Sequence, residues 1–173
     1  MRIAFTGYAA DCTISGEVEL DSDRLKDQLD GDEHVVVHRA VLESLHDGRV
    51  ICVPRMELDR DDLFAAEAVA PRGPRGRRIH TVRHAIVATC GPYRIEGLVH
   101  ERPGARPMAA IQSGRPIVSV TDARVTFQSA GQPVRRHAVT LLVDSSRLEW
   151  VGDARAQGPH PAIPAYDFPT EMR

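Results

Sequence analysis

The sequence lacks the long apolar segments that mark membrane proteins and exported proteins. It contains no run of roughly 18 apolar residues, so no transmembrane helix is expected. The first residues, MRIAFTGYAAD, carry only a brief apolar stretch, without the long hydrophobic region of a signal peptide. We therefore expect a cytoplasmic protein whose N-terminus forms a first strand.

Cysteine is scarce. The three cysteines are Cys12, Cys52 and Cys90, an odd number with no C-x-x-C pair. This pattern favours small, buried apolar side chains in a reducing compartment over a redox or metal-binding role.

Catalytic and nucleotide-binding motifs are missing as well. The chain has no G-x-S-x-G, no H-E-x-x-H, no cysteine-protease signature and neither of the glycine-rich phosphate loops. Aromatic residues make up only 5% of the chain, too few for an extended base-stacking platform. The sequence therefore predicts a protein that is not an enzyme and needs no cofactor.

Metal ligands are weakly indicated. His34 with His38, and His80 with His84, are four residues apart and share a face of a strand or helix, but zinc needs further converging ligands. The acidic residues between positions 21 and 33 lack the spacing of a calcium loop. We therefore predict that the histidines lie on the surface, that the acidic segment is a solvated loop, and that the chain has no metal site.

What the chain does contain is an internal repeat, in which residues 3–64 match residues 86–149 in the same order. The matched segments are Ile3–Thr6 with Ile86–Thr89, Thr13–Val18 with Arg94–Val99, Arg24–Leu29 with Arg106–Ile111, Val35–Val41 with Val118–Arg124, and Met56–Asp59 with Leu141–Asp144. The alternative is that two unrelated β-rich segments share a similar pattern. We interpret the match as duplication of one unit.

Strands dominate the predicted secondary structure. Ile14, Gly16 and Val18 alternate with polar residues, a period that is typical of a strand with one buried face. Asp47-Gly48 and Ala130-Gly131 are suited to hairpin turns. Short helices are expected at 24–29 and 106–111. A third is expected at 61–69, with Asp59, Asp61 and Asp62 as its N-cap and first turn. The fold class is all-β, with one short helix per unit.

The second copy resembles the Sm-like family over His84–Val99, Pro116–Val125 and Ala138–Val151. These segments show a strand, an I-x-G on a bent second strand, an apolar strand that ends in D-A, and a closing strand. Gly16 and Gly97 are the structural residues of this pattern, because a strand in a very small barrel must bend sharply. The resemblance implies a duplicated, strongly bent small barrel.

A closer resemblance is to small bacterial Sm-like proteins of unknown function, which carry R-x-x-D-x-L as Arg24–Leu29 does here. Copy two departs from that pattern with Ala109 in place of the aspartate. Both copies also lack the loop motifs with which RNA-binding Sm proteins contact nucleotides. No RNA-contacting residue can therefore be assigned by resemblance, and the acidic loop of copy one would repel phosphate.

Four segments follow from this interpretation. Residues 1–70 form an acidic first unit, 71–83 a Pro/Gly/Arg linker, 84–151 a second unit, and 152–173 a proline-rich extended tail. The tail carries Ile163, Tyr166 and Phe168, which are suited to anchor an extended peptide on a protein partner.

Charge is divided unevenly along the chain. Residues 1–70 hold 16 acidic and 7 basic residues, a net charge of −9, whereas residues 71–173 hold 8 and 15, a net charge of +7. We predict a scaffold or adaptor that self-assembles, or docks on a larger complex, through strand edges and its C-terminal peptide. The alternative is a nucleic-acid-binding protein that uses linker arginines Arg72, Arg75, Arg77 and Arg78.

Overall fold

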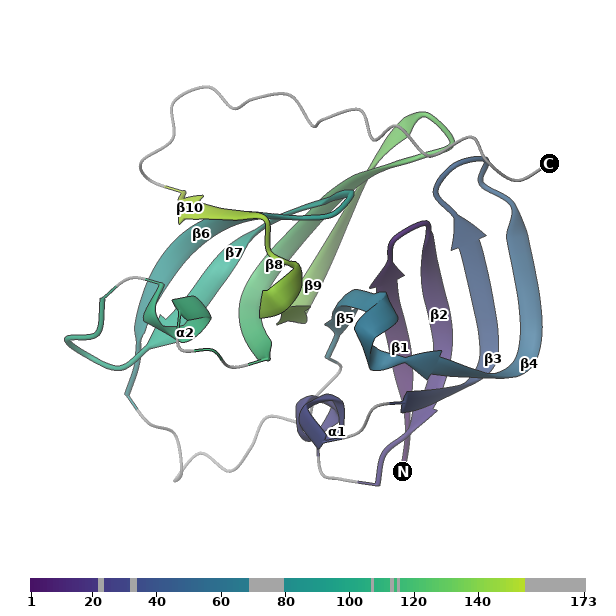
Figure 1. Ribbon diagram of the computed structural model, residues 1–173, viewed down its shortest axis with the longest axis horizontal. Helices are drawn as coiled ribbons and strands as arrows, with labels where there is room; N and C mark the ends of the chain where they lie inside the picture. The colour runs from purple at the N-terminus through teal and green to yellow at the C-terminus, as the bar shows by residue number, and fades with distance from the viewer. Residues whose placement is uncertain are drawn as a thin grey trace.

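The computed structural model describes residues 1–21, 24–31, 34–68, 80–106, 108–112, 114 and 116–154 (Figure 1). The first half of the chain contains β1 (Arg2–Ala9), β2 (Cys12–Glu19), α1 (Leu25–Gly31), β3 (His34–Ser44), β4 (Val50–Asp59), the 3-10 turn η1 (Arg60–Asp62) and β5 (Leu63–Glu67). The second half contains β6 (Val82–Cys90), β7 (Tyr93–Glu101), α2 (Ala109–Gln112), β8 (Ile117–Ser129), β9 (Gln132–Asp144), η3 (Ser145–Arg147) and β10 (Trp150–Asp153).

All ten strands belong to one antiparallel sheet, in the order β10-β6-β7-β8-β9-β5-β1-β2-β3-β4. The predicted all-β class is therefore confirmed. The expected small barrels are not closed: within the described residues, β5 pairs with β1 and with β9 of the other half, and not with β4. Figure 1 shows the two halves side by side, with β5 and β9 between them.

The two halves have the same strand order. In the first half the sheet runs β5-β1-β2-β3-β4, and in the second it runs β10-β6-β7-β8-β9. In each half a helix follows the second strand and a 3-10 turn joins the fourth strand to the fifth. Gly16 lies opposite Phe5 on β1, and Gly97 lies opposite Ile86 on β6, so Phe5 is the structural counterpart of Ile86. The predicted match of Ile3 with Ile86 was therefore two residues out of register.

A local irregularity bends the third strand of each half. Arg39 and Asp122 both have a φ of 50°, and the strand register shifts where each faces the neighbouring glycine strand. The buried positions on β3 change from Val35 and Val37 to Ala40 across this point. An extra residue in one strand is the usual cause of such a bend.

Turn chemistry is well explained by local sequence. Ala130 and Gly131 have φ values of 49° and 73°, as a two-residue hairpin turn requires, and Gly48 has a φ of 71°.

The predicted helix at 24–29 is confirmed as α1, and that at 106–111 is a shorter helix, α2. The helix expected at 61–69 is wrong: η1 makes one turn, and β5 then begins at Leu63.

The core is divided into two clusters, and each draws residues from both halves. The cluster of the second half includes Tyr8, Leu45 and Ala65 of the first. The cluster of the first half includes Ile117 and Leu142 of the second. The two halves therefore complete each other's cores.

Strand boundaries differ slightly from the predicted segments. β6 begins at Val82, inside the range expected as linker, and β10 ends at Asp153, inside the range expected as tail. No helix within the described ranges is long and apolar enough to cross a membrane.

Candidate functional site

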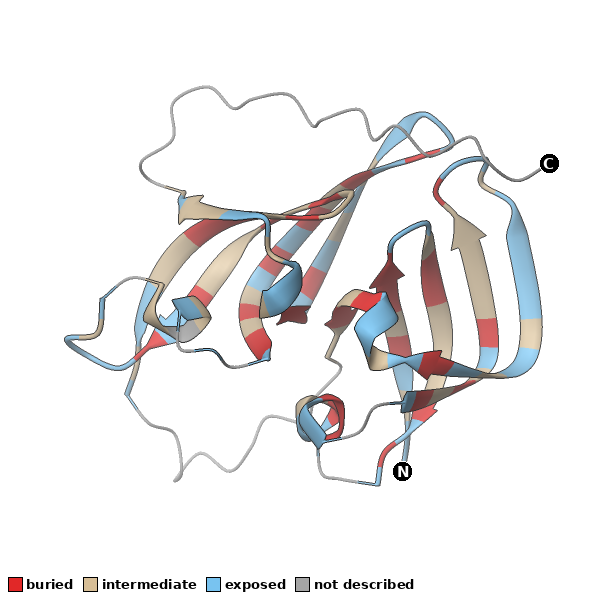
Figure 2. Cartoon of the chain, viewed as in Figure 1, coloured by how far each residue is buried: buried red, intermediate tan, exposed pale blue. Residues whose placement is uncertain are grey.

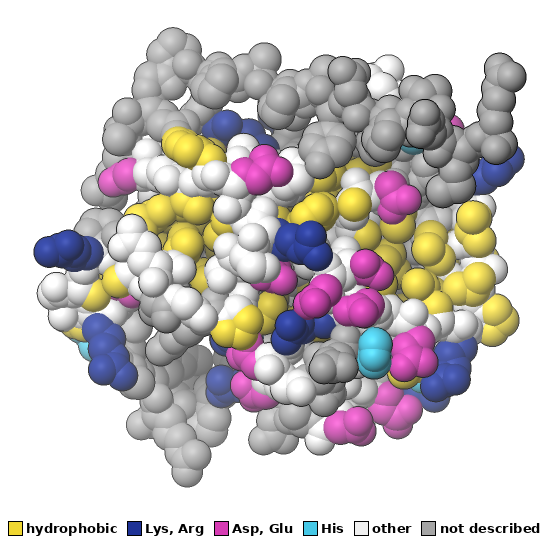
Figure 3. Space-filling view, viewed as in Figure 1, with side chains coloured by type: hydrophobic (Ala, Val, Ile, Leu, Met, Phe, Trp, Pro, Cys, Tyr) yellow, Lys and Arg dark blue, Asp and Glu magenta, His cyan; other side chains and the backbone are white. Residues whose placement is uncertain are grey.

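The first end of the sheet is β4, whose outer edge has no partner strand among the described residues. Val50 and Ile51 are 56% and 53% exposed, and Cys52 is exposed beside them. Figure 2 shows this strand as mostly exposed, and Figure 3 shows hydrophobic side chains gathered over it. An apolar edge strand with free backbone groups is a template for another strand.

The second end is β10, which pairs on one side with β6. The Ala154 N–H donates to the Ala85 carbonyl at 3.1 Å. Because backbone groups alternate along a strand, Val151 directs its N–H away from β6, toward the side of β10 that has no partner strand among the described residues. Trp150, at the start of β10, is 45% exposed. This end is short, but it also offers backbone groups and an apolar side chain.

Both edges carry features that limit indiscriminate pairing. Pro54 lies within β4 and has no N–H to donate, while Arg55 and Glu57 place charges on the same strand. Asp153 ends β10 with a further charge. Proline and charged residues on an edge strand limit nonspecific strand pairing.

The sheet contains one internal example of pairing between the halves, the junction of β5 with β9. Ala65 lies opposite Val143, Ala66 opposite Leu142 and Glu67 opposite Leu141. The Ala68 N–H donates to the Thr140 carbonyl at 2.9 Å and extends the ladder by one residue.

Aromatic side chains reinforce this junction. The ring of Tyr93 lies 5.2 Å from that of Tyr8 and 5.4 Å from that of Phe127, both in edge-to-face geometry. The Tyr93 hydroxyl donates to the Ala9 carbonyl at 2.6 Å, and the Tyr8 hydroxyl donates to Glu67 at 2.6 Å. Burial raises the pKa of both tyrosines, with a further contribution from Glu67 at Tyr8.

Polar contacts also cross between the halves. Arg136 pairs with Glu43 at 3.5 Å, and the Ala130 N–H donates to the Leu45 carbonyl at 2.8 Å. Lys26 on α1 donates to the Ile117 carbonyl at 2.9 Å. The junction thus joins strands, hairpin tips and a helix, which explains how the two halves form one sheet.

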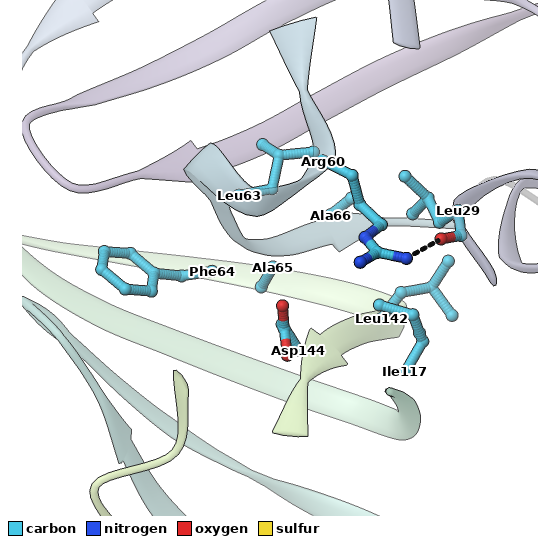
Figure 4. A pocket seen from close by; sticks show the side chains of 9 residues that line it. All are labelled: Leu29, Arg60, Leu63, Phe64, Ala65, Ala66, Ile117, Leu142 and Asp144. Atoms are coloured by element: carbon cyan, nitrogen blue, oxygen red, sulfur yellow. Dashed lines mark hydrogen bonds between the residues drawn. The ribbon is translucent and has the colours of Figure 1, made fainter. Parts of the chain in front are cut away.

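A small pocket lies at the same junction (Figure 4). Its lining residues are Leu29, Arg60, Leu63, Phe64, Ala65, Ala66, Ile117, Leu142 and Asp144. Arg60 donates to the Leu29 carbonyl at 3.5 Å, and Asp144 accepts from the Ser146 N–H at 2.8 Å. The pocket is mostly apolar, and its two charged groups, Arg60 and Asp144, make structural contacts.

The predicted structural residues Gly16 and Gly97 have matching surroundings. A Cβ on Gly16 would lie 2.7 Å from the His38 carbonyl oxygen, and a Cβ on Gly97 would lie 2.6 Å from a methyl group of Val120. Real side chains do not make contacts this short, so both positions require glycine for close approach of the third strand.

The other predicted site residues lie outside the described residues. These are the tail anchors Ile163, Tyr166 and Phe168 and the linker arginines Arg72, Arg75, Arg77 and Arg78. Among the described residues, no group of three His, Cys, Asp or Glu side chains gathers as metal ligands.

The cysteines differ in environment. Burial raises the pKa of Cys90 to about 12, and burial with nearby Asp11 raises that of Cys12 to about 12, so both thiols are protonated and poorly nucleophilic at neutral pH. The prediction of burial is confirmed for Cys90, whereas Cys12 is half-buried, and it is wrong for Cys52, which is exposed on β4. An edge position leaves one side of its strand uncovered.

Sequence reasoning missed the two edges themselves. Val50–Val53 is a short apolar run typical of a strand, and nothing in it distinguishes an edge strand from an inner one. Trp150 was included in the Sm-like match without a role. The lone tryptophan near the end of the second copy was the available signal, since tryptophan is enriched at binding surfaces.

Comparison with protein-family models, curated proteins and solved structures found no match to this chain.

Proposed function

We propose that this chain is a non-enzymatic scaffold or adaptor that self-assembles, or docks on a larger complex, through its strand edges. One observation carries the proposal: among the described residues, β4 and β10 at the two ends of the ten-stranded sheet each pair with a strand on one side only, and each carries exposed apolar side chains. Edge strands of this kind bind partners by adding a strand, with backbone hydrogen bonds for affinity and side chains for specificity.

We further propose that the chain consists of two tandem Sm-like units. The common strand order of the halves supports this, as do the matching glycine positions and the irregularity at Arg39 and Asp122. The helix after the second strand and the short turn before the fifth strand also agree with the resemblance.

Opposite charge in the two halves also supports an interface protein. In the sequence, residues 1–70 are acidic and residues 71–173 are basic, and each favours a partner of complementary charge. Charge of this kind mainly raises association rates and selects partners, whereas apolar edge residues supply most of the affinity.

The proposal is tested by measuring the mass of the full chain by light scattering, alone and in a lysate of its native cells. We expect a mass above the 19.0 kDa of one chain. Val151→Pro should abolish the larger species, because it removes an N–H at the open edge and leaves the pairing with β6 intact. Val139→Ser is the matched control, since Val139 is 67% exposed on a strand at neither end of the sheet.

A mass of 19.0 kDa in both conditions, unchanged by Val151→Pro, would refute the proposal. An excess of absorbance at 260 nm, with binding that weakens steeply in salt, would instead favour nucleic-acid binding through the linker arginines.

The C-terminal peptide is a separable part of the proposal. Deletion of residues 155–173 leaves β10 complete and removes Ile163, Tyr166 and Phe168. We expect partners captured from native cells to be lost or reduced with this deletion. An unchanged set of partners would show that the tail is not a docking peptide.

A further inference from the structure

The strand register of the second half places arginines and the lone tryptophan in one row across the sheet. Trp150 lies opposite Thr89, Thr89 opposite Arg94, Arg94 opposite Thr126, and Thr126 opposite Arg135. Residues that are directly opposed in a sheet share a face. The row therefore crosses five neighbouring strands, β10-β6-β7-β8-β9, with the tryptophan at one end and an arginine at the other.

This row lies on the face of the sheet that points away from the core. Ile95 and Val125 alternate with the row along β7 and β8, and both belong to the core cluster of the second half. Successive side chains of a strand point to opposite faces, so the row points outward. The side chain of Arg124, one position along β8 from Val125, is 61% exposed on the same outer face, and Arg135 and Trp150 are exposed as well.

Guanidinium groups outnumber carboxylates on this face. Glu96 lies opposite Arg124 and contacts it at 3.4 Å, and it contacts Arg94 at 3.1 Å. Within the described part of the chain, Arg135 makes no ion pair. Three arginines and one glutamate leave a net charge of +2, so the face attracts a group of negative charge.

We propose that this surface, the arginine face, binds an extended acidic segment of a partner protein. It consists of Arg94, Arg124, Thr126, Arg135 and Trp150. Carboxylates of the segment accept hydrogen bonds from the guanidinium groups and the threonine hydroxyl, and an apolar side chain of the segment packs on the indole. The proposal goes beyond the proposed function, because it concerns a face of the sheet and not its edges.

The spacing of the row defines the segment that fits. Neighbouring strands lie about 4.8 Å apart, which puts Arg94 about 10 Å and Arg135 about 19 Å from Trp150. An extended peptide spans about 3.3 Å per residue, so carboxylates about three and about six residues from an apolar side chain match the row. The predicted ligand is therefore an aromatic or aliphatic residue with acidic residues at these two spacings.

The distribution of carboxylates on the face favours a protein segment over nucleic acid. Glu96 stands between two of the arginines, and Asp122 lies nearby in contact with His137 at 2.7 Å. A nucleic acid carries a charged phosphate at every nucleotide, which these carboxylates would repel. A peptide can carry neutral residues at the same places.

A labelled peptide tests the proposal directly. The probe has one phenylalanine followed by glutamates about three and about six residues later in a Gly/Ser background. We expect saturable binding to the full chain by fluorescence anisotropy, weakening as salt rises. Trp150 is the only tryptophan, and its emission should shift to the blue as the phenylalanine covers it. A peptide with lysines in place of the glutamates should not bind.

Charge reversal identifies the surface that binds the peptide. Arg124→Glu and Arg135→Glu should each weaken binding about tenfold or more, because each replaces an attraction by a repulsion. Arg49→Glu is the matched control, since Arg49 is exposed in the turn between β3 and β4 and the net charge changes equally. The double variant at 124 and 135 should prefer the lysine peptide. Circular dichroism checks that each variant is folded.

Three results would overturn the proposal. The first is absence of binding by the glutamate peptide, or an equal loss with Arg49→Glu. The second is tighter binding of a single-stranded oligonucleotide with the same dependence on the arginines, which would make the face a nucleic-acid site. The third is a shift of Trp150 emission with protein concentration alone that Arg135→Glu abolishes, which would make a second copy the occupant.

The test is independent of the proposed function. Arg135 lies on β9, at neither end of the sheet, so Arg135→Glu should leave an edge-dependent complex intact. Failure of peptide binding would therefore leave the edge proposal standing. Peptide binding by a chain that forms no edge-dependent complex would support the arginine face alone.

Discussion

At the scale of residues, two glycines show how local chemistry decides a fold. Gly16 and Gly97 lie where the third strand of each half approaches the neighbouring second strand closely, against backbone and valine side chains. The sequence indicated both, because a glycine inside an alternating strand pattern marks a bend or a close approach. Their neighbours in space, such as His38 and Val120, were not predictable from that pattern, since they depend on strand pairing.

Replacing either glycine by alanine should destabilise the chain. The new methyl group would lie 2.7 Å from a carbonyl oxygen at position 16 or 2.6 Å from a methyl group at position 97. We expect a loss of about 1–3 kcal/mol in the free energy of unfolding for each, measured by urea denaturation.

Gly31→Ala is the matched control for these two variants. Gly31 ends helix α1, and among the described residues no atom beyond its chain neighbours and its own helix backbone lies within 4 Å of a Cβ built there. This variant should be neutral or slightly stabilising, because alanine favours a helix more than glycine does. Equal losses at all three positions would contradict the role of close approach.

At the scale of elements, strands with a clear alternating pattern were predicted and the short connecting strand was not. β2 and the two hairpin turns follow directly from alternation and turn chemistry. β5 was expected to be helical, because Leu63–Glu67 is rich in leucine, alanine and glutamate, which favour helices. Pairing with β1 and β9 on both sides overrides that preference.

Buried groups near the junction of β5 with β1 and β9 should make the folded chain less stable at alkaline pH. Burial raises the pKa of Cys90 from 9.0 to about 12, and burial raises the pKa of Tyr93 well above its ordinary value of 10.0. The unfolded chain releases these protons first, so rising pH favours unfolding. The stability from each protonated group is complete below its ordinary pKa and is lost as pH rises toward the folded value.

We therefore expect the free energy of unfolding to fall above about pH 9, with a slope of up to about 1.4 kcal/mol per pH unit for each such group. Urea denaturation at a series of pH values checks this. Cys90→Ala should lower by one the number of protons released on unfolding, and the slope of the free energy of unfolding against pH should fall accordingly. A free energy that stays constant through this range would contradict burial of these groups at the junction.

At the scale of the whole molecule, each half contributes to the core of the other. Tyr8 packs among residues of the second half, and Leu142 packs among residues of the first. This arrangement was beyond sequence reasoning, which left open whether the two repeats share a core. It follows from the β5 and β9 pairing, which brings distant segments together.

The shared cores predict a single cooperative unfolding transition. Trp150 fluorescence reports on the second half alone, whereas circular dichroism reports on all strands. The two signals should change at the same urea concentration, as in two-state unfolding. Two separated transitions would show that the halves fold independently.

The chain specifies strands, turns, bends and charge through local chemistry, because alternation, glycine and turn residues act over a few positions. Tertiary structure alone decides which strands are neighbours, and hence that β4 and β10 end the sheet, that Cys52 is exposed and that the halves share cores. An alternating pattern shows that one face of a strand is buried. It says nothing about which strand accepts its backbone hydrogen bonds, since that choice depends on segments far apart in the sequence.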